Sequence, residues 1–356
     1  MKKISVIIAL AALAASAACT KIVSDDAAPA KRVTFFAANY VPQTKAGEVS
    51  FLSEFANPAN AQFKSKGFLH AEGVSDTQNF FGADGETITW NATAKEWAPS
   101  HDYYWPKGAE SYINFVSWYD TGEGPTTATE EKLEWANRTI GTGDNIMYAD
   151  EAWRFKENNN PATYGLNDVK GGVPTLFHHA LSQIKIQARA SKVTNSTANW
   201  TITLKEIKVK DIYNQGTLTL TNSDPNTEKT PKAWTGNWTV SGSKGNLTPA
   251  NLALTAANQD LLANQSVLPQ ALSGIALEFK LEIVTAYSNV SNTEIITKSI
   301  PFYAATGEAF SNSISNWEQN KKYIYTLVIE PSEKRVLFDP AVETDWETVT
   351  VPEKKI

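Results

Sequence analysis

The sequence predicts an all-β protein made of two tandem β-sandwich domains, and three observations lead to this prediction. Apolar and charged residues alternate over residues 275–283, and the same period recurs at residues 184–189 and 323–329. This alternation is typical of antiparallel strands with one buried face. No segment after the first twenty residues holds a convincing helical period, although residues 251–264 could form one short helix. The length of 356 residues exceeds what one core usually holds, which favours two domains.

A lipoprotein signal peptide is expected at residues 1–18. It starts with two lysines, continues with an apolar segment at residues 4–13 and ends in small residues before Cys19, the only cysteine of the chain. We expect Cys19 to be acylated and to become the new N-terminus, which would anchor the protein to a membrane. The alternative is an ordinary secretory signal with an incidental cysteine, since Ser16 stands where Leu is usual at a lipoprotein cleavage site.

A flexible tether is predicted at residues 19–32, which are mostly small and polar. The next segment, residues 33–41, has strand composition and would begin the N-terminal domain. Its apolar residues include Val33, Phe35, Phe36 and Val41. Because neighbours in a strand face opposite sides, we expect either Phe35 or Phe36 to enter the core, where full burial contributes about 1.5–3 kcal/mol.

The boundary between the two domains is predicted at residues 172 and 173, which gives domains of residues 33–172 and 173–356. Two glycines and a proline at residues 171–174 free the backbone and interrupt strand pairing there. In the second domain, the parity of the apolar positions changes at Lys205 and Glu206. We predict a β-bulge at that point, because otherwise the following side chains would turn to the wrong face.

The C-terminal residues 335–351 are predicted to form two short strands around a linker that contains Pro340 and Trp346. The apolar residues of these two strands include Val336, Phe338, Val349 and Val351. In the simplest interpretation they close the second domain as an ordinary terminal hairpin.

No catalytic, cofactor or metal site emerges from the sequence, and we expect neither enzymatic activity nor a cofactor. His178 and His179 are adjacent in a predicted strand and would point to opposite faces, so they cannot chelate one ion side by side. Asp144, Asp150 and Glu151 lack the glycine-centred spacing of calcium loops and are interpreted as solvated loop carboxylates. The net charge of −6 and the absence of a basic run disfavour nucleic acid as a partner.

A series of aromatic signatures runs through almost the whole chain in a specific order. On these signatures the chain resembles the fimbrillin family of Bacteroidetes, especially its short-fimbria (Mfa-type) branch. The signatures are Tyr103-Tyr104-Trp105-Pro106, residues 113–119, 144–149, 177–184 and 317–327, and the closing Phe338-Asp339-Pro340 and Asp345-Trp346.

The resemblance implies a fold of two transthyretin-like β-sandwiches and a role as a subunit of a type V-like pilus that supports adhesion. It implies export as a lipoprotein to the outer membrane and cell surface. It also implies that a trypsin-like surface protease removes the first strand, and that the subunits then polymerise by donor-strand exchange. A cut at Lys45–Ala46 would remove the strand, whereas the alternative cut at Arg32–Val33 would leave it in place. The donor would be the strand pair at residues 335–351.

Two alternatives remain open at this stage. One is an unprocessed tip, anchor or accessory subunit of the same fold. The other is a surface lipoprotein that binds glycans or a host receptor through exposed aromatic side chains. The partners expected under these readings are other fimbrial subunits, the membrane, the protease and a receptor.

Overall fold

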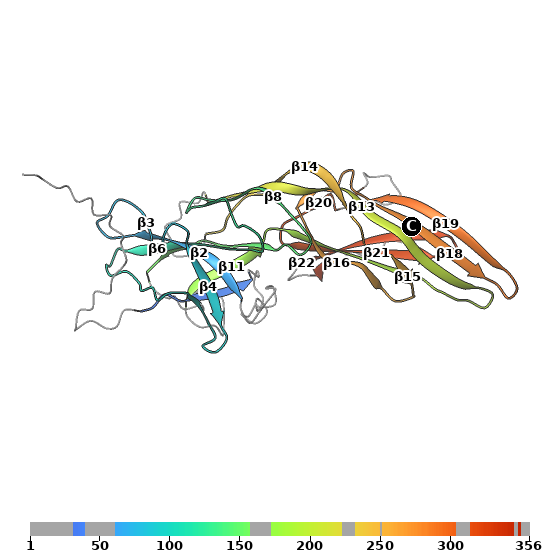
Figure 1. Cartoon of the computed structure of the whole chain (residues 1–356), viewed down its shortest axis with the longest axis horizontal. Coiled ribbons are helices and arrows are strands. Elements are labelled where there is room, and N and C mark those ends of the chain that lie inside the picture. The colour runs from blue at the N-terminus through green and yellow to red at the C-terminus, as the bar shows by residue number, and fades with distance from the viewer. Residues whose placement is uncertain are drawn as a thin grey trace, which may run out of the picture.

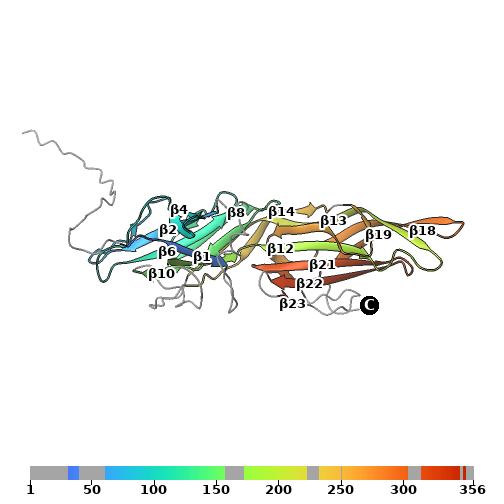
Figure 2. The same cartoon turned by 90° about the horizontal axis from the view of Figure 1, so that it is seen from below.

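The computed structural model describes residues 31–39, 61–156, 172–222, 232–249, 251–303, 314–344 and 348–349. Every regular element in these ranges is a β-strand, which confirms the all-β prediction. Among the same residues, no helix is long and apolar enough to cross a membrane. The molecule is elongated, with the early strands gathered at one end and the late strands at the other (Figures 1 and 2).

The N-terminal half is a nine-stranded sheet, seven of whose strands close into a ring. β2 pairs with both β4 and β6, which joins the two edges that an open sandwich would leave free. This closure differs from the open two-sheet arrangement expected for the first domain. In sheet order the strands are β10 (Ala152–Phe155), β6 (Tyr112–Asp120), β9 (Ile146–Ala149), β11 (Val173–His179), β1 (Phe35–Asn39), β5 (Glu96–Pro99), β4 (Glu86–Asn91), β2 (Gln62–His70) and β3 (Gln78–Asn79).

The C-terminal half consists of a seven-stranded and a five-stranded sheet around one core, with a small two-stranded sheet beside them. The larger sheet contains β19 (Ser291–Pro301), β18 (Ala276–Ala286), β13 (Asn199–Thr221), β8 (Lys132–Thr139) and β7 (Thr127–Ala128), with β14 (Trp238–Leu247) and β15 (Leu252–Leu254) also paired to β13. The other sheets contain β16 (Gln259–Val267), β12 (Ser182–Ala190), β21 (Lys321–Glu330), β22 (Arg335–Thr344) and β23 (Thr348–Val349), and β17 (Gln270–Ala271) with β20 (Asn316–Trp317).

The alternating segments lie where the pattern predicted them. The apolar residues of β12, β18 and β21 point into the shared core, and their charged neighbours lie on the other face. The predicted bulge is confirmed, because the register of β13 against β18 shifts between Leu204 and Glu206. Lys205 and Glu206 are both exposed there, and burial resumes at Ile207.

The short helix considered for residues 251–264 is wrong. This stretch contains β15 and the first part of β16, which pair with β13 and β12 respectively. Leu254 and Leu261 enter the core from these two strands. Backbone pairing with long neighbouring strands therefore decides the conformation of a segment whose local pattern was ambiguous.

A third core joins the two halves. β6 and β9 are buried on both faces: Phe115 and Met147 point into the ring, whereas Trp118 and Tyr148 pack outward. The outward side chains meet β8, β13 and β14 of the larger C-terminal sheet. The expected domain boundary at residues 172 and 173 falls at the start of β11, and the chain leaves the ring only after His179.

Candidate assembly site

The first strand, β1, fills a place in the ring between β11 and β5. It pairs in parallel with β11 along its whole length, from Phe35 opposite Val173 to Asn39 opposite Phe177. Its contact with β5 is a single antiparallel pair, Phe35 with Trp97. Since β1 is the only described strand that links β11 to β5, its removal would open the ring and leave the edges of both strands unpaired.

The side chains of β1 are buried on both faces. Phe35 is 2% exposed, and its ring packs edge-on against Phe63 and Phe115, with centroids 5.9 and 5.4 Å away. Val33 and Ala37 enter the same core. Phe36 points the opposite way and is also buried, in a small cluster with Ala38 and Leu176. Phe35 is therefore the phenylalanine that enters the core, as one of the two was expected to do, and Phe36 is buried too because the outer face of β1 is covered as well.

Gly172 allows β1 to lie close to the start of β11. A Cβ atom at this position would lie 2.7 Å from the carbonyl carbon of Phe35 and 3.0 Å from the nitrogen of Phe36. No side chain fits at such a distance from a backbone. The glycine that suggested a domain boundary in the sequence is therefore needed to seat the first strand.

The peptide bond between Arg32 and Val33, the alternative cleavage site, is part of the folded ring. Val33 is fully buried and its N–H donates to the carbonyl oxygen of Tyr103, at 2.8 Å. The guanidinium of Arg32 contacts Glu96 and lies 3.2 Å from Asp102. A protease needs an extended and accessible segment, and this bond is neither free nor exposed.

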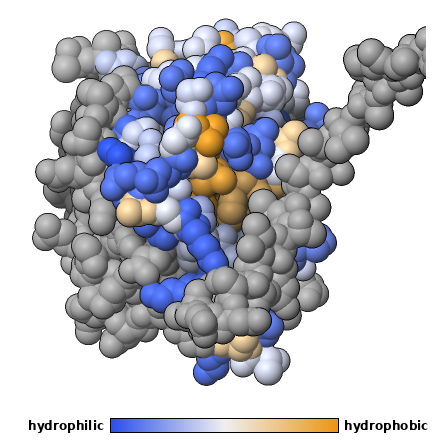
Figure 3. All heavy atoms as spheres, turned by 90° about the vertical axis from the view of Figure 1, so that its left-hand side faces the viewer, coloured by the Kyte–Doolittle hydropathy of each residue, from blue (hydrophilic) through white to orange (hydrophobic). Residues whose placement is uncertain are grey.

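The end face of the N-terminal half carries a small apolar patch surrounded by hydrophilic residues (Figure 3). Val74 and Tyr104, which are 46% and 48% exposed, are the exposed large apolar side chains of the described N-terminal strands and loops. Tyr104 forms a β-bridge with Arg32, so the chain enters β1 beside this residue.

The predicted C-terminal strands correspond to β22 and β23, which lie at the edge of the five-stranded sheet. β22 pairs with β21 over ten positions, and Pro340 belongs to this strand rather than to a linker. β23 covers β22 only at Val342 and Glu343. Val336 packs half-buried against the core, and Phe338 pairs in register with Leu327. Val349 pairs with Val342.

Several predicted residues cannot be placed. Cys19, Val41, Lys45, Ala46 and Val351 lie outside the described residues, as does Trp346. The anchor and the preferred cleavage site therefore stay predictions.

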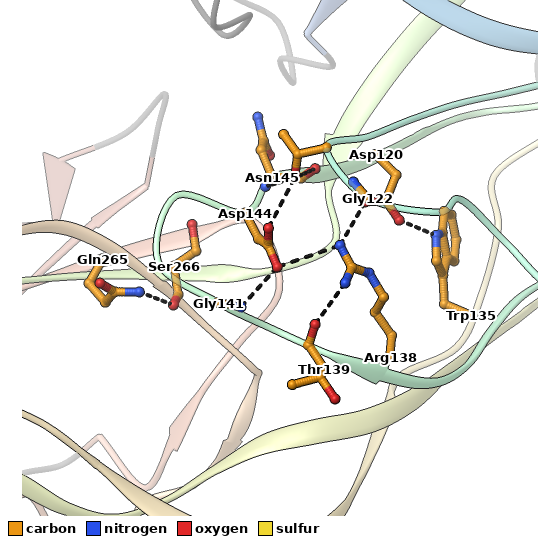
Figure 4. Close-up of polar contacts among 11 residues, drawn as sticks. Asp120, Gly122, Trp135, Arg138, Thr139, Gly141, Asp144, Asn145, Gln265 and Ser266 are labelled. Carbon is orange, nitrogen blue, oxygen red and sulfur yellow. Dashed lines mark hydrogen bonds and ion pairs between the residues drawn. The ribbon is translucent and has the colours of Figure 1, made fainter.

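A polar cluster that the sequence did not reveal holds the junction between the two halves (Figure 4). Nη2 of Arg138 lies 3.0 Å from Oδ1 of Asp120 and 3.5 Å from Oδ2 of Asp144, so one cation on β8 joins the end of β6 to the loop before β9. Asp120 also accepts a hydrogen bond from Nε1 of Trp135, at 2.9 Å. Gly122 leaves the space for the guanidinium. The Asp120 side chain is 1% exposed, so the charge pair is largely removed from water.

The carboxylates interpreted as solvated are in part deeply buried, so that interpretation is wrong. Asp150 is 6% exposed and contacts Nε2 of His178 at 2.9 Å, and Glu151 is fully buried. Both belong to the turn between β9 and β10, which packs against the C-terminal half. His179 instead contacts Oδ1 of Asn145. Among the described residues, no three or more His, Cys, Asp or Glu side chains gather closely enough to hold a metal ion.

Comparison with known proteins gives one family and a fold. The profile of a family described as fimbrillin-like matches residues 68–346. The structure of a fimbrial protein from Bacteroides vulgatus superposes with a TM-score of 0.51 at 14% identity, covering 88% of this chain and 99% of the other. A candidate cell adhesion protein from Bacteroides uniformis gives a TM-score of 0.45 at 16% identity, covering 88% and 97%. No curated protein matches the sequence.

Proposed function

The chain belongs to the fimbrillin-like family, and from that premise we propose that it is a structural subunit of a cell-surface fimbria that polymerises by donor-strand exchange. The position of β1 in the ring is the observation that supports this proposal most directly. β1 is short, it lies near the start of the described chain, and among the described strands it alone joins β11 to β5. Its loss would leave an apolar groove bordered by unpaired backbone groups, which a strand from another copy can fill.

We propose that the removal step is a cut between Lys45 and Ala46 by a trypsin-like protease. This cut would sever β1 from the rest of the ring, whereas a cut at Arg32 would leave the strand in place. The burial and hydrogen bonding of Val33 also disfavour the alternative site in the folded protein. If Cys19 carries the lipid anchor, the same cut would release the subunit from the outer membrane.

The proposed donor is the C-terminal strand pair, β22 with β23. It lies at a sheet edge, so it can leave without breaking pairs on both sides of a central strand. Its departure costs the ten-residue pairing with β21, which pairing with the next copy would replace. Within this proposal, the ring and the C-terminal half are two transthyretin-like domains, and the ring, which includes β11, accepts the strand that the C-terminal half donates.

Limited digestion with trypsin tests this function. The purified mature protein should be cut after Lys45 and should then form ladders on mildly denaturing gels. Lys45→Gln should abolish both the cut and the ladders. Arg32→Gln is the matched control and should change neither. A stable monomer that has lost β1 but forms no ladder would contradict polymerisation and would favour an accessory role.

A further inference from the structure

A buried cluster of a carboxylate, an amide and an amine lies where the ring meets the end of β13. Glu151 is fully buried, and its Oε2 accepts a hydrogen bond of 2.5 Å from the amide nitrogen of Asn222. Lys232 is 8% exposed, and its Nζ stands 3.2 Å from the centre of the Trp153 ring. A buried lysine beside a buried glutamate and an asparagine amide is an unusual set for a junction made mainly of apolar side chains.

The backbone brings the three side chains to one face. Glu151 and Lys232 exchange both backbone hydrogen bonds, each of 2.9 Å, so their side chains stand next to each other on the same side. The segment that begins at Lys232 is paired on its other side with the end of β13, through Thr221 and Thr235. The contact from Glu151 to Asn222 therefore crosses over the strand that carries Lys232.

The polar atoms of this cluster are not all paired. Among the described residues, Oε1 of Glu151, Oδ1 of Asn222 and Nε1 of Trp153 are buried without a hydrogen-bond partner. Two of these are acceptor oxygens on side chains already joined by one hydrogen bond. A proton on Oε1 of Glu151 would supply the missing donor for Oδ1 of Asn222. Burial, with the charge of Glu130 nearby, raises the pKa of Glu151 to about 8, so this carboxyl holds its proton at neutral pH.

We propose that Lys232 and Asn222 form an intramolecular amide cross-link, with Glu151 as the acid–base group of the reaction. Nζ of Lys232, deprotonated, attacks Cγ of Asn222, whose carbonyl oxygen accepts a hydrogen bond from protonated Glu151. The new Cγ–Nζ bond forms and the Cγ–Nδ2 bond breaks. Glu151 returns one proton to the departing nitrogen and takes one from Nζ, so that ammonia leaves and Glu151 is unchanged.

The site favours this reaction for two physical reasons. The groups are held together by the sheet, so an otherwise slow attack of an amine on an amide becomes an intramolecular step. The cluster is also shielded from water, and this burial favours the protonated, neutral form of the Glu151 carboxyl. For the attack, Nζ of Lys232 would have to leave its position over the ring of Trp153 and approach Cγ of Asn222. The bond would tie Lys232 covalently to the end of β13. Its formation does not depend on the proposed function.

Mass spectrometry of the purified full-length mature protein tests the proposal. The intact mass should be lower than the sequence mass by one molecule of ammonia. Lys229 lies between the two linked residues, so trypsin should yield one branched peptide containing Asn222 and Lys232 instead of two linear ones. Lys232→Arg and Glu151→Gln should each restore the full mass and the linear peptides.

Lys244→Arg is the matched control, because Nζ of Lys244 also stands over an aromatic ring, that of Tyr213, at 5.2 Å. It should leave the branched peptide in place. A wild-type protein with the full sequence mass and only linear peptides would overturn the proposal and leave a non-covalent acid–amide pair. A branched peptide that persists in Glu151→Gln would overturn the role of Glu151.

Discussion

Truncating Phe35 to alanine should weaken the packing of β1 in the ring and destabilise the protein strongly. Burial of a phenylalanine side chain that is 2% exposed contributes about 1.5–3 kcal/mol. Its edge-on contacts with Phe63 and Phe115 add about 0.5–1.5 kcal/mol each. The total agrees with the roughly 3–5 kcal/mol usual for such truncations. We therefore expect Phe35→Ala to lower the free energy of unfolding by about 3–5 kcal/mol.

Urea unfolding followed by tryptophan fluorescence measures this loss. Phe36→Ala is the matched control on the same strand, since Phe36 belongs to a cluster with only Ala38 and Leu176. It should cost clearly less, because it has fewer large neighbours to lose. In the trypsin assay, Phe35→Ala should also release the cut strand faster and speed polymerisation. Equal losses for the two variants, or a loss below about 1 kcal/mol for Phe35→Ala, would refute the assignment of Phe35 as the anchor of β1.

Three further predictions follow from the described contacts. Gly172→Ala should lower the free energy of unfolding in urea by about 1–3 kcal/mol, because its Cβ would meet the backbone of Phe35. Gly245→Ala is the control and should be nearly neutral, because the space around its Cβ is open. Equal effects of the two substitutions would contradict the close approach of β1 to Gly172. Arg138→Ala should lower the free energy of unfolding by about 3–5 kcal/mol, because it leaves the carboxylate of Asp120 buried without its cation. A loss near zero in urea unfolding would contradict a stabilising role of Arg138 at the junction. The pKa of Glu151 is raised from 4.5 to about 8, so the stability that its proton provides is complete below pH 4.5 and is lost as the pH rises through 8. The free energy of unfolding, measured from pH 5 to 9, should therefore decline, and Glu151→Gln should flatten this decline. The same decline in Glu151→Gln and in the unsubstituted protein would contradict the role of Glu151.

Much of the fold could be predicted from the sequence, because a period of two residues is a local property of the chain. The alternation in β12, β18 and β21 and the change of parity at Lys205 and Glu206 specify which face of each strand is buried. The first and last strands could be located as well. Residues 251–264 could not be assigned correctly, since their conformation depends on partners far away in the chain.

The candidate site was predictable only in part. The composition of residues 33–41 identifies a strand, but only the ring shows that β1 has neighbours on both edges and is covered on both faces. Gly172 marks a break in the sequence, and its purpose becomes visible only when β1 lies against it. Asp120 and Arg138 are eighteen residues apart and carry no motif, so no local signal could have paired them.

The sequence by itself determined that the chain is all-β, which faces of its long strands are apolar and which family it resembles, because these properties depend on the order of neighbouring residues. Only the tertiary structure decided that the early strands close into a ring, that a third core joins the two halves and that Glu151, Asn222 and Lys232 lie on one face. The physical reason is that pairing between distant strands and the burial of charge depend on the whole arrangement of the chain. The residues of one segment do not specify that arrangement.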